Sequence, residues 1–97
     1  MLYAYAQDVP IDEAVYRKII ERLGPDPLNG LVLHLAVERP GGLRYIDVWE
    51  SREACERAFD ERIHPAVYAT FSEIGFAPEG EPEKQELRVV DIARGLV

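Results

Sequence analysis

Residues 31–50 read LVLHLAVERPGGLRYIDVWE and decide the fold, because they predict two β-strands around a tight turn. The runs 31–38 and 43–50 flank a turn and alternate between two kinds of side chain, as the strands of a hairpin do. The intervening RPGG places proline second and glycine third, the pattern of a type II β-turn. If Arg39 and Gly42 close the turn, the sequence predicts an antiparallel hairpin in which His34 lies opposite Asp47 and Val32 opposite Trp49.

Alternation along the two strands sorts their side chains onto two faces. We expect the aliphatic face to pack beneath helices; it holds Leu31, Leu33, Leu35, Val37, Ile46 and Val48. The other face holds Val32, His34, Ala36, Glu38, Leu43, Tyr45, Asp47 and Trp49. One sheet and two helices would leave this second face uncovered, although about half of it is apolar or aromatic. Such a patch usually marks an interface, so the sequence predicts a homodimer in which two sheets pack face to face.

The segment before the hairpin predicts a strand and a helix. LYAYAQ (2–7) alternates bulky and small residues and indicates the first strand. Asp12 is a suitable N-cap for a helix that runs to about Leu23, where Gly24 ends it. Ile11 and Tyr16 stand where a hydrophobic staple would place them.

The segment after the hairpin predicts a second helix that begins at the N-cap Ser51. Pro65 lies inside its helical pattern and is expected to kink or split the helix and to restrain His64 toward extended geometry. A second helical segment then runs from about Pro65 to Ile74. After an acidic connection, LRVVDIA (87–93) predicts the last strand.

The predicted order is β-α-β-β-α-β, the ferredoxin-like arrangement of the α+β class. Right-handed crossovers then place the first strand between the third and the fourth, with both helices on one face of an antiparallel sheet. The chain of 97 residues suits a single domain, residues 1–97.

The composition excludes some partners. A net charge of −7 argues against binding to a nucleic acid backbone or an anionic membrane surface. The N-terminus lacks the basic segment and the long apolar run that are typical of a signal peptide. Cys55 is the only cysteine, so no internal disulfide can form. These features predict a cytoplasmic protein with a reduced thiol.

The block GLRYIDVWESREACERAFDERIHPAV resembles antibiotic biosynthesis monooxygenase-like proteins of the dimeric α+β barrel superfamily, through its VWES-EA-E-F---R--P skeleton. The length and the β-α-β-β-α-β order agree over nearly the whole chain. The resemblance implies a homodimeric α+β barrel. It also implies a group that includes cofactor-independent oxygenases acting on polycyclic aromatics, haem-degrading enzymes and many small proteins of no known function.

The resemblance carries over no catalytic residue. Haem-degrading members use an asparagine on the first strand, and LYAYAQ contains none, so haem degradation is not implied here. We therefore expect no bound cofactor. Two functions stay open: a cofactor-independent monooxygenase acting on a small aromatic or polyketide-like substrate, and a non-catalytic homodimeric module that binds a small hydrophobic ligand.

Three residues are candidates for catalysis. His34 and Asp47, paired across the hairpin, could form an oriented imidazole that accepts a proton. Alternatively, the pair could fix the strand register at a buried dimer surface. His64 precedes the expected kink, which could open a cleft, but it could also form an exposed helical pair with Asp60.

Aromatic side chains could line a ligand pocket between sheet and helices, although such residues are also ordinary core. The candidates for ligand binding are Tyr5, Tyr45, Trp49 and Phe59, with Tyr3, Phe71 and Phe76 as further lining residues. Two histidines and one cysteine show no metal-ligand spacing. Cys55 lies on the apolar stripe of the second helix and is expected to be inert core.

Overall fold

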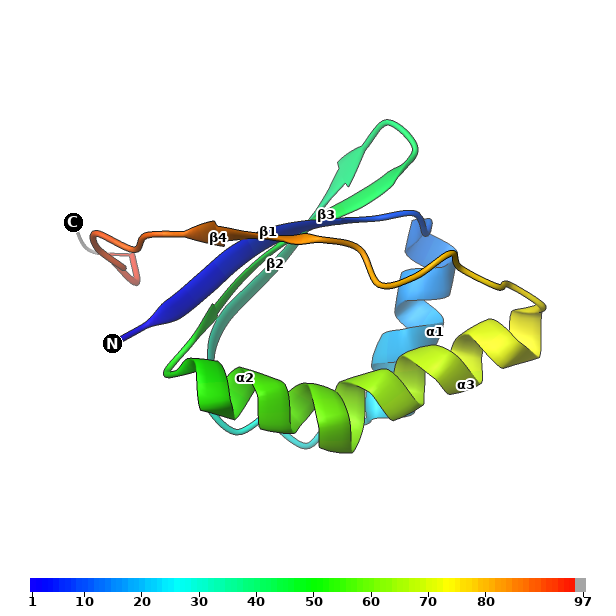
Figure 1. Ribbon diagram of the computed structural model, residues 1–97, viewed down its shortest axis with the longest axis horizontal. Helices are drawn as coiled ribbons and strands as arrows, with labels where there is room; N and C mark the ends of the chain where they lie inside the picture. The colour runs from blue at the N-terminus through cyan, green and yellow to red at the C-terminus, as the bar shows by residue number, and fades with distance from the viewer. Residues whose placement is uncertain (96–97) are drawn as a thin grey trace.

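A computed structural model describes residues 1–95 and shows one four-stranded antiparallel sheet with all helices on one face (Figure 1). The elements are β1 (Tyr3–Val9), α1 (Glu13–Leu23), β2 (Leu31–Arg39), β3 (Gly42–Trp49), α2 (Arg52–Ala58), a π-helical turn η1 (Phe59–Ile63), α3 (His64–Ile74) and β4 (Lys84–Leu87). The strand order is β2-β3-β1-β4, so β1 lies between β3 and β4 as predicted. The α+β fold class is confirmed. Among residues 1–95, no helix is long and apolar enough to cross a bilayer.

Both predicted N-caps form. The Asp12 carboxylate accepts a hydrogen bond from the backbone N–H of Val15 at 2.9 Å, which satisfies a donor that the first turn of α1 leaves unpaired. The Ser51 hydroxyl accepts from the N–H of Ala54 in the same way at the start of α2. Gly24 follows α1 with a positive φ of 81°, so α1 begins and ends where the sequence predicts.

The hairpin has the predicted register from Leu33 to Arg39, including His34 opposite Asp47. Gly41 has a φ of 84°, as the third position of a type II turn requires. One pair is wrong: a bulge between Leu31 and Leu33 places Leu31, not Val32, opposite Trp49. The extra residue shifts Leu31 onto the face that carries Trp49.

Pro65 does not split the second helix, and the expected extended geometry of His64 is wrong. His64 is helical, with φ −58° and ψ −45°, and α2, η1 and α3 follow one another without a break. The π turn explains this: the His64 N–H donates to the carbonyl of Phe59, five residues back. The wider turn immediately before Pro65 accommodates a ring that would clash with a regular α-helical turn.

The predicted last strand, 87–93, is wrong. The observed β4 is the polar segment Lys84–Leu87, which pairs antiparallel with Gln7 to Ala4 of β1. Because β1 begins at Tyr3, a residue beyond Leu87 has almost no partner left on that strand. The side chain of Gln7 also donates to the carbonyl of Pro82 at 2.9 Å, which fixes where the chain joins the sheet.

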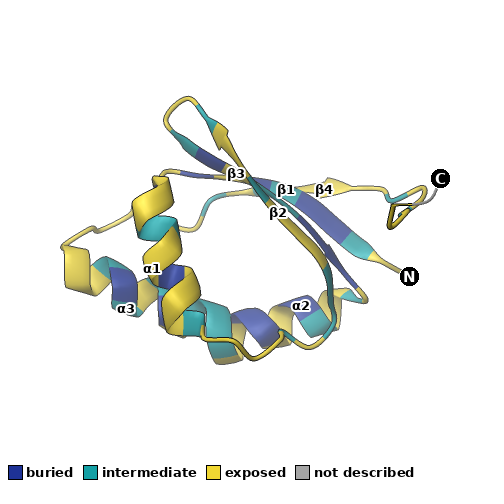
Figure 2. Cartoon of the chain, turned by 180° about the vertical axis from the view of Figure 1, so that it is seen from behind, coloured by how far each residue is buried: buried dark blue, intermediate teal, exposed yellow. Residues whose placement is uncertain are grey.

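The assignment of the two sheet faces is also wrong. The helices cover the face that carries Asp47 and Trp49, which are only 4% and 1% exposed. The aliphatic face is the uncovered one: Leu33, Leu35 and Val37 are 44%, 46% and 39% exposed, and β2 is drawn largely as exposed in Figure 2. One signal in the sequence could have shown this. Arg44 alternates onto the aliphatic face, where it forms an exposed ion pair with Asp8 of β1.

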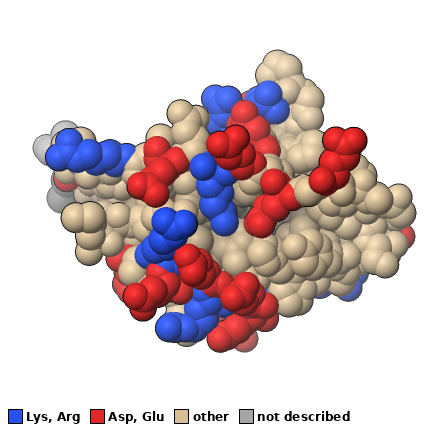
Figure 3. Space-filling view, in the orientation of Figure 1, with Lys and Arg blue, Asp and Glu red and all other residues tan. Residues whose placement is uncertain are grey.

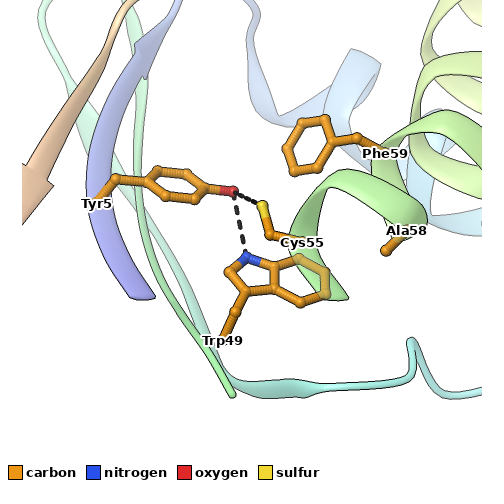
Figure 4. Close-up of a cluster of buried hydrophobic side chains, with 5 residues drawn as sticks. All are labelled: Tyr5, Trp49, Cys55, Ala58 and Phe59. Carbon is orange, nitrogen blue, oxygen red and sulfur yellow. Dashed lines mark hydrogen bonds between the residues drawn. The ribbon is translucent and has the colours of Figure 1, made fainter. Parts of the chain in front are cut away.

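A cluster of buried aromatic residues joins the sheet to the long helical segment (Figure 4). The indole Nε1 of Trp49 donates to the Tyr5 hydroxyl at 3.3 Å, and the Cys55 thiol contacts the same oxygen at 3.9 Å. Phe59 packs on Trp49 with ring centroids 6.4 Å apart. Burial raises the pKa values of the Tyr5 hydroxyl and the Cys55 thiol, which agrees with Cys55 as an unreactive core residue.

Acidic side chains are interspersed among the basic ones on the face shown in Figure 3. This distribution accompanies a net charge of −7 and differs from the clustered basic surface typical of nucleic acid binding.

A substitution at Gly30 tests the packing between the start of the hairpin and α2. A Cβ there would lie 2.6 Å from the Cβ of Ala54, and its φ is 87°. We expect Gly30→Ala to lower the free energy of unfolding by about 2–4 kcal/mol, through backbone strain and overpacking together.

Gly41→Ala is the matched control, since Gly41 has a φ of 84° and a Cβ added there would have nothing within 4 Å. It should lose only about 1–2 kcal/mol from backbone strain. Urea unfolding measures both variants. Equal losses would contradict the close contact between Gly30 and α2.

Candidate functional site

A cavity of about 460 Å³ lies between the covered face of the sheet and the helices. Its volume is in the range of small-molecule sites, and its wall is mainly apolar with a few polar groups. The polar side chains on the wall are Gln7, Tyr16, Asp26, His34, Tyr45, Asp47, Arg62, His64, Tyr68 and Glu81. The cavity therefore brings together both histidines of the chain, which are 30 residues apart in the sequence.

His34 bridges two groups on this wall. Its Nδ1 contacts Oδ1 of the buried Asp47 across the hairpin, and its Nε2 lies 2.8 Å from the hydroxyl of Tyr16 on α1. An ionised carboxylate can only accept hydrogen bonds, so Nδ1 carries the proton and Nε2 accepts from Tyr16. The arrangement is a chain, Asp47–His34–Tyr16, in which the carboxylate orients the imidazole.

Burial raises the pKa of the Tyr16 hydroxyl, so Tyr16 is protonated near neutral pH and can donate to His34. A lone pair of the same oxygen remains able to accept a hydrogen bond from a ligand. The side chain of His34 is 29% exposed, while that of Asp47 is 6% exposed. The chain therefore runs from a buried carboxylate to a hydroxyl on the cavity wall, and it can take a proton from a bound hydroxyl group.

Aromatic rings pack around the hydrogen-bonded chain Asp47–His34–Tyr16. The ring of Tyr16 lies nearly parallel to that of His34 with centroids 6.0 Å apart, and Tyr45 contacts His34 edge-on at 5.2 Å. Burial also raises the pKa of the Tyr45 hydroxyl. Such packing fixes the orientation of the imidazole.

His64 lies on the same cavity but not with its expected partner. Its Nε2 is 3.0 Å from Oε1 of Glu81, in the connection between α3 and β4, and not bonded to Asp60. Its ring stacks on Tyr68 at 5.3 Å and meets Phe59 edge-on at 5.3 Å. The prediction of an exposed pair within the helix is wrong, because the π turn changes the spacing between residues 60 and 64.

The structure places most of the sequence-based candidates around one space. His34, Asp47 and His64 line the cavity, as do Tyr45, Trp49, Phe59, Phe71 and Phe76. Tyr5 lies behind this wall in the buried cluster, and Tyr3 is also absent from the lining.

The sequence pattern does not reveal two polar residues of the site. Tyr16 fits that pattern only as a staple residue, and Glu81 belongs to an acidic connection with no periodic pattern. The hydroxyl of Tyr16 could have been suspected, because a tyrosine on the buried side of a helix usually requires a hydrogen-bond partner.

Within the part of the chain that the structure describes, no group of three His, Cys, Asp or Glu side chains is placed to hold a metal ion. Arg62, the one Lys or Arg side chain on the cavity wall among residues 1–95, is occupied: it donates to the carbonyls of Leu23 and Pro27 at 2.9 and 2.8 Å. It thus ties η1 to the end of α1.

The fold is shared with several solved structures. A protein of Chloroflexus aurantiacus J-10-fl, described as a putative antibiotic biosynthesis monooxygenase, superposes with a TM-score of 0.66 at 14% identity over 100% of both chains. Rv0793 from Mycobacterium tuberculosis superposes with a TM-score of 0.60 at 17% sequence identity, over 96% of this chain and 98% of that one. SnoaB from Streptomyces nogalater, a cofactor-independent oxygenase, superposes with a TM-score of 0.54 at 16% sequence identity, over 94% of this chain and 93% of that one.

No protein-family model matches the chain, and no curated protein matches its sequence. Identities of 14–17% show the fold and carry no residue roles. The chain thus has the α+β fold of the antibiotic biosynthesis monooxygenase-like proteins, as the resemblance of its sequence implied.

Proposed function

We propose that this protein is a cofactor-independent monooxygenase that acts on a small aromatic or polyketide-like substrate held in the 460 Å³ cavity. The observation that carries the proposal is the hydrogen-bonded chain Asp47–His34–Tyr16 on the wall of a mainly apolar cavity. SnoaB, which shares the fold, is a cofactor-independent oxygenase, and this supports the same reaction class.

The chemistry requires a base more than a redox group. When dioxygen converts a ring CH₂ of a phenolic substrate to a carbonyl, one oxygen atom enters the product and the other leaves as water. The substrate supplies the electrons, so the protein must activate it by removing a proton. Tyr16 accepts the hydrogen bond of the substrate hydroxyl, His34 takes the proton that Tyr16 passes on, and Asp47 stabilises the resulting imidazolium.

The apolar wall strengthens this effect, because charges interact more strongly where water is excluded. An electron-rich, deprotonated ring is also the form that reacts with dioxygen. The alternative function is a non-catalytic module that binds a small hydrophobic ligand in the same cavity. The two functions differ in whether removing the base abolishes turnover while binding persists.

We also propose that the protein is a homodimer through the uncovered sheet face. Leu33, Leu35 and Val37 form an exposed aliphatic strip along β2, and Leu87 on the opposite edge strand, β4, is on the same face. A contiguous patch of this kind on a small domain favours burial against a second copy.

His34→Phe tests the catalytic proposal with 1,8-dihydroxyanthrone (called anthrone below), a phenol whose ring CH₂ becomes a carbonyl, as the substrate. We expect dioxygen uptake to fall about 10²-fold or more in His34→Phe, because general base catalysis is lost while the ring is kept. Tyr16→Phe should also reduce it. An oxygen electrode measures the rate, and Trp49, the only tryptophan and part of the cavity wall, reports binding by fluorescence.

Glu56→Gln is the control, because Glu56 is exposed on α2 and pairs with Arg52 on the same helix. It should keep the wild-type rate. If His34→Phe retained full uptake, the base would be assigned wrongly. If anthrone quenched Trp49 while the wild type did not accelerate its oxidation, the binding module would be favoured.

Leu35→Glu tests the dimer. A charge in the middle of a desolvated sheet face is costly, so we expect the variant to sediment as a monomer at micromolar concentration where the wild type sediments as a dimer. Ile74→Glu introduces the same charge at another exposed residue, at the end of α3, and should leave the dimer intact. A wild-type monomer at that concentration would contradict the proposal.

A further inference from the structure

The cavity has a second polar pair, His64–Glu81, at some distance from the chain Asp47–His34–Tyr16. The second pair has no role in the proton transfer described above. Its position, its hydrogen-bond partners and its unpaired carboxylate oxygen indicate its role.

The two polar groups lie toward opposite edges of the sheet. His34 is on β2, the edge strand on one side, and Glu81 leads into β4, the edge strand on the other. Three spacings of about 4.8 Å separate these strands by about 14 Å. Contacts of neighbouring residues also place His64 beside the β4 edge. Nζ of Lys84, the first residue of β4, lies 3.9 Å from the ring centroid of Phe59, and Phe59 contacts His64.

The rest of the cavity wall is mainly apolar and aromatic. Its side chains include Tyr45, Trp49, Phe59, Ile63, Val67 and Phe71. A ligand that filled this space would be elongated and apolar in its middle, and would meet a hydrogen-bonding group at each end.

Both ends accept hydrogen bonds. At one end, the Tyr16 oxygen donates its proton to His34 and keeps a lone pair for the ligand. At the other end, Oε1 of Glu81 is engaged by His64, while Oε2 has no hydrogen-bond partner among residues 1–95. The Glu81 side chain is 45% exposed, so this oxygen is accessible. Two acceptors select two donors, and on the phenolic substrate of the proposed function these donors are hydroxyl groups.

We infer that His64–Glu81 is a second anchor that selects flat aromatic ligands with a hydroxyl group at each end. This inference rests on the proposed function. It adds that the substrate carries a second hydroxyl group at the end away from Tyr16. His64 holds the Glu81 carboxylate toward the cavity, and its own position is fixed by the stacked Tyr68 and the edge of Phe59. Glu81 is the specificity-determining residue, and His64 is a positioning residue.

Two isomers test the inference by calorimetric titration of the full chain. In 2,6-dihydroxynaphthalene the hydroxyls point to opposite ends, and in 2,3-dihydroxynaphthalene they share one end, so the two ligands have the same atoms and a similar polarity. We expect the 2,6-isomer to bind wild type about tenfold more tightly, the effect of one hydrogen bond to a carboxylate. Glu81→Ala should remove this preference, and Glu81→Gln, which keeps an acceptor, should restore part of it.

Glu79→Ala is the matched control, since Glu79 lies in the same acidic connection but not on the cavity wall. It should keep the full preference. Equal weakening of both isomers in Glu81→Ala would mean that Glu81 only holds the connection in place, and this would overturn the inference. Equal binding of both isomers to wild type would overturn it as well.

The outcomes separate this inference from the proposed function. If the isomers bind equally while anthrone oxidation depends on His34, only the second anchor is wrong. If neither isomer binds and anthrone is not oxidised, the cavity is not the ligand site and both proposals are wrong.

Discussion

One layer of helices can cover only one face of the four-stranded sheet, and the rest of the structure depends on which face that is. Both faces of the hairpin are apolar enough to be core. The helices cover the face with the longest aromatic side chains, where Trp49, Tyr5 and Phe59 pack together near the start of α2. At that end the layers touch. Further along they leave the cavity that contains the polar groups.

The choice of face has two consequences that belong together. Asp47 becomes a buried group and His34 a cavity-wall group whose side chain is 29% exposed, so the hydrogen bond between them is partly shielded from water. Leu33, Leu35 and Val37 become surface, which leaves an aliphatic strip for a partner. A candidate reaction site on one side of the sheet and a candidate assembly surface on the other thus arise from the same alternation of side chains.

The π turn η1 links the sequence of the long helical segment to the site. Pro65 cannot donate to a carbonyl one turn earlier, and the wider turn before it removes the conflict. The extra residue in the turn also brings Phe59, Ile63 and His64 onto the cavity wall together. π turns often occur at functional sites because they change which side chains share a face. Arg62 in the same turn is directed to the end of α1 and so joins the two helical segments.

The sequence by itself determined the order of the elements, the strand order, the helix caps and most of the hairpin register. These features depend on local rules: alternation, capping residues, turn residues and the handedness of crossovers. It also drew attention to His34, Asp47 and His64, which the structure places on one cavity, because rare polar side chains stand out in apolar strands and helices. Tertiary structure alone decided which sheet face is covered, the true position of β4, the continuity of the helix through Pro65 and the partners Tyr16 and Glu81. Each of these depends on contacts between segments far apart in the chain, where two solutions satisfy the local rules and only the packing of the whole domain selects one.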